Sequence, residues 1–214
     1  MLFRSAIWFG IEDMTAELVK KGQSVNKTEE LFSEMRRRKI LPMAMLMHYD
    51  GQPLYTKNSM SGLLNQVRFL RKVGAASVQI TVLGPAAGTK DYDQVMQSGI
   101  ILKTLGGRKV DDYLWDGNHV ISVGGATSSP WRLQRNLLIG YGSFYNPLNL
   151  LRAPLRKNWK FSDLFLQIWG MWGLAVTAWR LIPWMFRLSG VARGSYPVHN
   201  DVVRSRFPIA APDP

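Results

Sequence analysis

Polar residues stand where three apolar runs of this 214-residue sequence end. The first run ends in "GIED" at Gly10–Asp13, the second in "HYD" at His48–Asp50, and the third in Gly84-Pro85, followed by Gly88-Thr89. Carboxylate and imidazole groups in such places can bind a ligand or transfer protons. Because parallel strands open their carboxyl ends on one side of a sheet, the three groups predict one shared ligand pocket.

Each group also has a simpler interpretation, which the residues alone leave open. Glu12 or Asp13 could cap the helix that follows, and His48 could be a hydrogen-bonded structural residue. Gly84 and Gly88 could serve only a turn. The sequence has no metal-ligand spacing, no P-loop and no GxSxG motif, so it assigns no catalytic residue and no metal site.

The elements that would position these groups alternate between strand and helix. Each of the runs Ala6–Ile11, Ile40–Asp50 and Ser77–Pro85 precedes a helical pattern. This order predicts three consecutive βα units with parallel strands. The second run is almost continuously apolar, which is typical of a strand covered on both faces. A closed eight-stranded barrel takes roughly 250 residues, so we expect an α/β fold with a partial, incomplete parallel β/α barrel and a helical C-terminal extension.

Local signals place the ends of the expected helices. Asn26, with Glu29 three residues later, predicts the N-cap of the first helix. The basic run Arg36–Lys39 is predicted to face solvent at the end of that helix. Ser129 and Pro130 predict the start of a later helix that runs to about residue 145.

The chain divides into four expected segments. Residues 1–100 form the barrel portion, 101–158 a post-barrel segment with a helix, 159–190 an apolar Trp-rich helix, and 191–214 a disordered basic tail. A stripe of residues at spacings of three and four runs along the Trp-rich helix, and all but Trp184 are polar or small: Asp163, Gln167, Gly170, Gly173, Thr177, Arg180, Trp184 and Arg187. That stripe favours an amphipathic helix at a membrane interface over a spanning one, with packing on protein as the open alternative.

Charge and composition limit the function classes. The net charge is +12, and residues 129–214 carry 11 Lys/Arg against 3 Asp/Glu. Such a surface suits anionic lipid, nucleic acid or an acidic partner. The basic residues do not cluster with aromatic residues on one expected face, which argues against nucleic acid. The absence of cysteine excludes disulfides, a cysteine nucleophile and an iron–sulfur cluster held by this chain's thiolates.

Several stretches resemble radical S-adenosylmethionine enzymes that carry an N-terminal cobalamin-binding domain. These are "FGIEDMTAELVKKG", "SVQITVLGPAAGTKDYDQVMQSG", "YLWDGNHVI" and "WRLQRNLLIGYGSFYNP", and the similarity covers most of residues 5–150. Within that family, "HYDGQPLYT", "GLLNQVRFLRK" and the Trp-rich helix most resemble the hopanoid C-3 methylases. The third segment departs from the family pattern, with Gly84 where threonine is common and Ala86-Ala87 before Gly88.

The resemblance implies a function and assigns residues to it. The parent reaction would be methyl transfer to an unactivated carbon of a hopanoid-like lipid. The part of the S-adenosylmethionine site carried by this chain would comprise Gly10, Glu12, His48, Leu83, Gly84, Gly88 and Thr89. The substrate would lie near Asp50, Gln52 and Tyr55.

One departure from the family changes what this chain could do alone. The three-cysteine cluster motif and the cobalamin domain are absent, so we expect the C-terminal half only, from a split gene, a truncated gene or a partial record. The 4Fe–4S cluster and cobalamin would belong to a partner, the missing N-terminal half, and the isolated chain is expected to be non-catalytic. We expect a cytoplasmic protein, peripheral on the inner membrane face. The alternative is a non-catalytic membrane-surface binding module.

Overall fold

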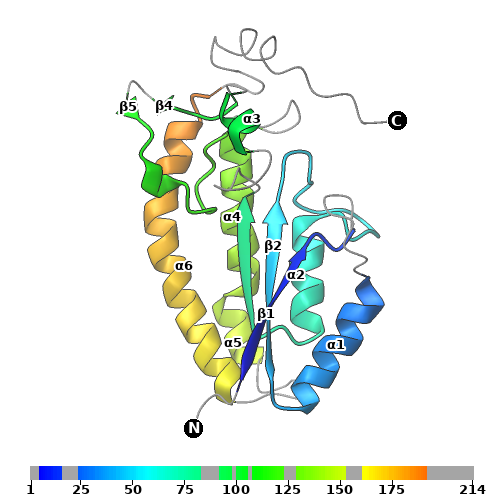
Figure 1. The fold of residues 1–214 in the computed structure, drawn as a ribbon. Coiled ribbons are helices and arrows are strands. Elements are labelled where there is room, and N and C mark those ends of the chain that lie inside the picture. The colour runs from blue at the N-terminus through cyan, green and yellow to red at the C-terminus, as the bar shows by residue number, and fades with distance from the viewer. Residues whose placement is uncertain are drawn as a thin grey trace, which may run out of the picture.

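The computed structural model describes residues 5–15, 24–82, 92–97, 100–105, 108–122, 129–152 and 161–191 (Figure 1). In chain order the elements are β1 (Ala6–Glu12), α1 (Val25–Arg37), β2 (Leu41–His48), α2 (Leu63–Lys72), β3 (Ser77–Val82), α3 (Tyr92–Gln97), β4 (Thr104–Leu105), β5 (Arg108–Lys109), the 3-10 helix η1 (Asp112–Leu114), α4 (Pro130–Phe144), α5 (Pro147–Arg152) and α6 (Phe161–Leu188).

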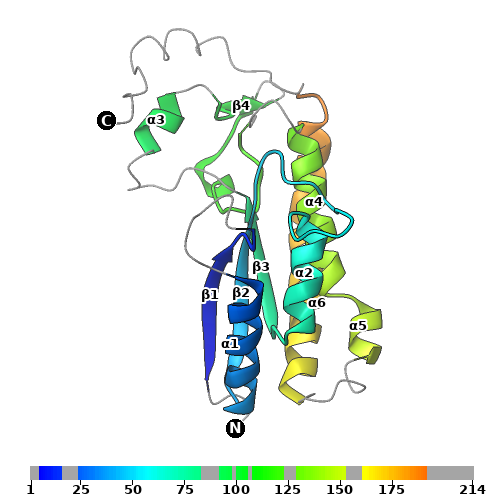
Figure 2. The ribbon, with the colours of Figure 1, turned by 90° about the vertical axis from the view of Figure 1, so that its right-hand side faces the viewer.

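The main sheet has the order β1-β2-β3, and both strand pairs are parallel. Helices α1 and α2 make the crossovers between successive strands (Figures 1 and 2). The predicted α/β class and the parallel strands are therefore confirmed. Within the described ranges the sheet is open and three-stranded, and no closed barrel is formed.

One face of the sheet carries the main core. Ala44 and Leu46 of β2 are fully buried, as are Phe32 of α1 and Leu70 of α2. Side chains alternate between the two faces of a strand, so the odd-numbered β2 positions point to the other face. There Met43, Met45 and Met47 are only half-buried. The expectation that both faces of this strand are covered is wrong for the described part of the chain.

The first helix differs from its prediction at both ends. Ser24, rather than Asn26, is its N-cap, and the Ser24 hydroxyl accepts a hydrogen bond from the Lys27 N–H at 3.2 Å. At the other end Arg36 does not face solvent. Its guanidinium donates to the Gly74 carbonyl at 2.7 Å and to the Asp163 carboxylate at 2.6 Å, so it joins α1 to α6.

Two tyrosines of α4 seal the outer edge of β3. The Tyr145 hydroxyl accepts from Val78 N–H at 2.9 Å and lies 2.9 Å from the Val78 carbonyl oxygen. The Tyr141 hydroxyl makes the same pair of contacts with Ile80, at 3.0 and 2.8 Å. Burial raises the pKa of Tyr141 to about 12 and also raises that of Tyr145, so both hydroxyls keep their protons.

The third outward-facing position of β3 is also closed, because Val82 N–H donates to the Gly117 carbonyl at 2.7 Å. The edge at β1 is different. In the described structure β1 pairs with β2 alone, and Ile7 and Trp8 are 44% and 46% exposed. The sheet therefore has one edge sealed by side chains and loop backbone, and one edge that presents apolar residues to solvent.

Helix α6 packs along α4 beside the sealed edge (Figure 1). Its observed range, Phe161–Leu188, confirms the predicted helix, whereas the predicted disordered tail from residue 192 onward lies outside the described residues. Among the helices that the structure describes, none combines the length and apolar character needed to cross a bilayer.

Candidate functional site

The carboxyl ends of the three strands meet at one edge of the sheet, as predicted. Glu12 ends β1, His48 ends β2, and Val82 ends β3, and the arrowheads point the same way (Figure 1). Their register places Glu12 beside Leu46 and His48 beside Val82. Four predicted cofactor residues, Leu83, Gly84, Gly88 and Thr89, lie outside the described residues.

Glu12 occupies a strained position at this edge. The β1–β2 register shifts between Gly10 and Glu12, and Glu12 has a φ of 58°, which side-chain-bearing residues rarely adopt. A Cβ atom on Gly10 would lie 2.6 Å from Glu12 Oε1, so the carboxylate folds back over the space that this glycine leaves. Backbone strain of this kind clusters at functional sites, and the bulge fixes where the carboxylate points.

Asp13, one residue later, has a structural role. It is 1% exposed, and Gln66 of α2 donates to its Oδ1 at 2.5 Å. Gln66 Oε1 in turn accepts from the Met14 N–H at 3.2 Å, and Thr15 donates to the Asp13 carboxylate. These bonds tie the turn after β1 to α2. Of the two neighbouring carboxylates, Asp13 is therefore structural, and Glu12 is the candidate for ligand binding.

His48 and Gln52 form a buried pair after β2. They are 0% and 3% exposed, and His48 Nδ1 lies 2.7 Å from Gln52 Oε1. Burial lowers the pKa of His48, although the bond to Gln52 and the charge of Asp50 oppose the shift, so the ring stays neutral at pH 7. Within the described structure His48 Nε2 and Gln52 Nε2 have no hydrogen-bond partner. Such buried atoms each cost about 1–3 kcal/mol, which a bound ligand could offset.

The two remaining predicted substrate residues are not part of that buried pair. Asp50 is half-buried in the turn between His48 and Gln52. Tyr55 is 54% exposed, and the guanidinium of Arg68 on α2 lies 5.6 Å from its ring centroid. The structure therefore brings His48 and Gln52 together and leaves Tyr55 on the surface.

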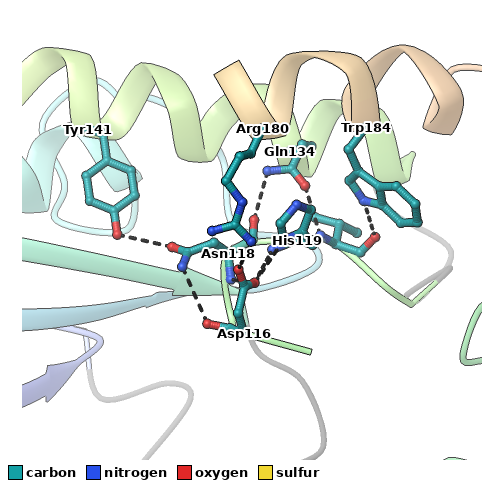
Figure 3. Close-up of polar contacts among 8 residues, drawn as sticks. Asp116, Asn118, His119, Gln134, Tyr141, Arg180 and Trp184 are labelled. Carbon is teal, nitrogen blue, oxygen red and sulfur yellow. Dashed lines mark hydrogen bonds and ion pairs between the residues drawn. The ribbon is translucent and has the colours of Figure 1, made fainter. Parts of the chain in front are cut away.

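A loop from residue 116 to 119 closes the same edge at β3 (Figure 3). The Asp116 carboxylate accepts from the N–H groups of Asn118 and His119 at 2.8 and 3.0 Å, and lies 3.0 Å from His119 Nδ1. Arg180 of α6 reaches its other oxygen at 3.4 Å. Burial alone would raise the pKa of Asp116, but the hydrogen bonds from His119 and from the backbone together lower it.

Two helical side chains, from α4 and α6, hold this loop in place (Figure 3). Gln134 of α4 accepts from Val120 N–H and donates to the Asn118 carbonyl, both at 2.9 Å. Trp184 of α6 donates to the Val120 carbonyl at 3.0 Å, and its ring meets His119 edge-on with centroids 5.9 Å apart. The His119 side chain is 3% exposed, so it serves as a packed support for the loop.

From the sequence, Asp116, Gln134, Tyr141 and Tyr145 have no predicted role, and Arg180 is predicted only as part of the polar stripe of the Trp-rich helix. The signal available for the loop was "DGNH", because Asp and Asn beside Gly form turns in which carboxylates bond the following N–H groups. Gly117 has a φ of 73°, as such a turn requires. The two tyrosines carry no comparable signal, since their partners are backbone atoms more than 60 residues earlier.

Replacing Asp116 with asparagine should lower the free energy of unfolding by about 1 kcal/mol at neutral pH, because charge-assisted hydrogen bonds are lost. The fold lowers this carboxyl's pKa, so its contribution is complete above the unfolded value of roughly 3.9. It is lost as pH falls through the folded pKa. Unfolding measured against pH should therefore show a constant gap that closes below about pH 4.

Asp111→Asn is the matched control for that measurement, because Asp111 lies in the same segment and is exposed. It should leave the unfolding free energy unchanged at every pH. A gap between the wild-type chain and Asp116→Asn that persists in acid would contradict the assigned pKa direction.

No protein family, curated protein or solved structure was found to match this chain. In the residues that the structure describes, no group of three or more His, Cys, Asp or Glu side chains is placed to hold a metal ion.

Proposed function

We propose that this chain is the C-terminal half of the catalytic barrel of a cobalamin-dependent radical S-adenosylmethionine enzyme. The parent reaction is methyl transfer to an unactivated carbon of a hopanoid-like lipid. The proposal starts from the sequence resemblance over residues 5–150 and treats the three-stranded sheet as part of a partial parallel β/α barrel.

The observation that carries the proposal is the difference between the two sheet edges. A self-sufficient sheet covers or blunts both edges, because an open apolar edge invites pairing with other chains. Here Tyr141, Tyr145 and Gly117 occupy the outward groups of β3, which suits the last strand of a barrel portion. The exposed apolar side chains of β1 suit a strand that would pair with a further strand on its other side.

The residues present fit part of an S-adenosylmethionine site. The buried His48 Nε2 and Gln52 Nε2 offer hydrogen bonds that nothing in the described structure takes up, and the bulge directs the Glu12 carboxylate. Because Gln52 Oε1 can only accept, the neutral His48 ring carries its proton on Nδ1, which leaves Nε2 as an acceptor and Gln52 Nε2 as a donor. A carboxylate such as Glu12 suits the ribose hydroxyls or the amino group of the cofactor.

The iron–sulfur cluster does not fit this chain, because the sequence contains no cysteine thiolates. A partner polypeptide would have to supply the cluster and cobalamin. When bound, these groups supply the electron and the methyl group of the reaction. This chain's share is to bind and orient the cofactor and the lipid at the strand ends, and to exclude water there.

The test is reconstitution with a polypeptide that carries the motif Cys-x3-Cys-x2-Cys, encoded in the same genome. Under anaerobic reducing conditions the pair should convert S-adenosylmethionine to 5′-deoxyadenosine, and this chain alone should not. In the pair, Glu12→Gln and His48→Phe should each lower the rate at least tenfold. Glu30→Gln makes the same chemical change on the exposed side of α1 and should leave the rate unchanged.

Two results would overturn the proposal. One is cofactor cleavage by this chain alone. The other is an unchanged cleavage rate in the reconstituted pair when this chain carries Glu12→Gln or His48→Phe, as with the control Glu30→Gln.

A further inference from the structure

Helix α6 carries apolar side chains on its outward side as well as on the side that packs into the core, whereas an ordinary surface helix has a polar outward side. Its large outward side chains are apolar, and each is between 41% and 83% exposed. They are spread along the helix from its first turn to its last, and comprise Phe161, Ile168, Trp169, Trp172, Val176, Trp179, Ile182 and Phe186. We call this set the outer face of α6.

The contacts on the inner side fix this orientation. Gly170 lies against the ring of Tyr145, and Gln167 and Trp184 are buried. Arg36 of α1 binds Asp163 at 2.6 Å near the start of the helix, and Trp184 binds the Val120 carbonyl near its end. The first part of the predicted stripe, Asp163, Gln167 and Gly170, thus faces the protein, whereas Gly173, Arg180 and Arg187 are exposed. The helix cannot hide the outer face without breaking these contacts.

The charges around the outer face are positive. Arg180 lies 3.4 Å from the Asp116 carboxylate but keeps a side chain that is 52% exposed, and Arg187, seven residues later on the same side of the helix, is also exposed. Asp163 is the one acidic residue in the α6 sequence, and it is paired with Arg36. Residues 129–214 carry 11 Lys/Arg against 3 Asp/Glu. An occupant of the outer face therefore meets apolar surface bordered by arginine.

These features point to a bilayer surface rather than to a second protein. The 28-residue helix is about 42 Å long, and it is held against α4 along one side. Tryptophan and arginine around an apolar stripe match the boundary between acyl chains and headgroups, where indole rings and guanidinium groups both find partners. Anionic headgroups would complement Arg180 and Arg187.

We propose that the outer face of α6 docks the protein on the surface of a bilayer that contains anionic lipid, with the helix lying in the plane of the interface. This deepens the proposed function, and rests on it for the lipid nature of the substrate. Helix α6 runs in the same direction as the strands, and its C-terminal part meets the loop at residues 116–119 (Figures 1 and 3). Docking would therefore bring the carboxyl edge of the sheet close to the lipid.

The experiment is flotation of the purified full chain with phosphatidylcholine vesicles, with and without phosphatidylglycerol. The chain should float with vesicles, and phosphatidylglycerol should strengthen binding. Trp172→Glu and Trp179→Glu place a carboxylate on side chains that are 66% and 83% exposed, and each should weaken binding at least tenfold. Arg187→Glu should remove the added effect of phosphatidylglycerol.

Leu31→Glu is the matched control, because it replaces another exposed apolar side chain that belongs to α1 rather than to the outer face of α6. It should float like the wild-type chain, and circular dichroism should show that all variants keep their helices. Equal flotation of the Trp172→Glu, Trp179→Glu and control variants would overturn the proposal. So would lipid-independent dimerisation lost in the tryptophan variants, which would assign the outer face to a second copy. Neither assay uses the cofactor or the cysteine-bearing partner, so failure here is distinct from failure of reconstitution.

Discussion

Tyr145→Phe should lower the free energy of unfolding by about 1–3 kcal/mol, because it leaves buried backbone groups of β3 without their partner. The phenylalanine ring would keep the edge-on contact with Phe144, whose centroid is 4.8 Å away. Only the hydroxyl is removed, and with it the contacts to Val78 N–H, the Val78 carbonyl and the Ser77 hydroxyl. Chemical denaturation measures the loss.

Amide hydrogen exchange adds a local readout for the same variant. The Val78 N–H should exchange faster in Tyr145→Phe, and the Ile80 N–H should do so in Tyr141→Phe, since each hydroxyl serves one residue of β3. Tyr113→Phe removes a hydroxyl from a ring that is 68% exposed and should change neither quantity. If Val78 N–H stays protected in Tyr145→Phe, the tyrosine does not seal the edge.

Gly170→Ala should destabilise the protein by about 1–3 kcal/mol, because a new methyl group has no room. A Cβ at residue 170 would lie 2.1 Å from Tyr145 Cε1, well inside contact distance. The ring cannot move aside cheaply, since its hydroxyl is fixed to β3. Helix α6 would have to shift outward from the sheet, and thermal unfolding would report the loss.

Gly173→Ala, one turn along the same helix, is the matched control. A Cβ at residue 173 meets nothing within 4 Å. Alanine is the better helix former, so this change should stabilise by roughly 0.5–1 kcal/mol. The two variants thus differ in sign although the substitution is identical. Equal effects would show that α6 does not pack on Tyr145 as described.

The regular elements were predictable because their signals are local. Strands β1, β2 and β3 and helices α1, α2 and α6 each follow from hydrophobic periodicity over a short window. The N-cap of α1 shows the limit, since Ser24 and Asn26 are both good caps and the choice depends on where the chain leaves the preceding loop. Periodicity also found the stripe on α6 but gave no indication that its first part, Asp163 to Gly170, faces the protein while Arg180 and Arg187 stay exposed.

Residues of the candidate site could be predicted only where the position of a strand end determines where the side chain lies. Glu12 and His48 lie at the carboxyl edge because parallel strands end there, and Gln52 joins His48 through a turn of four residues. Tyr55 is only three residues further along but lies at the surface. Arg36 was predicted to face solvent, because its partner Asp163 is 127 residues away and no local pattern indicates that contact. Contacts across such separations depend on tertiary packing, which the local pattern does not encode.

The difference between the two sheet edges also limits how copies of this protein can aggregate. Open-ended fibres need two receptive surfaces on every unit, so that each addition exposes another. With the β3 side occupied by tyrosine hydroxyls, strand addition to the main sheet as the described residues form it could use only the β1 side. Such growth would stop at a dimer of two units paired through β1. The tyrosines would therefore prevent fibre growth, in addition to stabilising the fold.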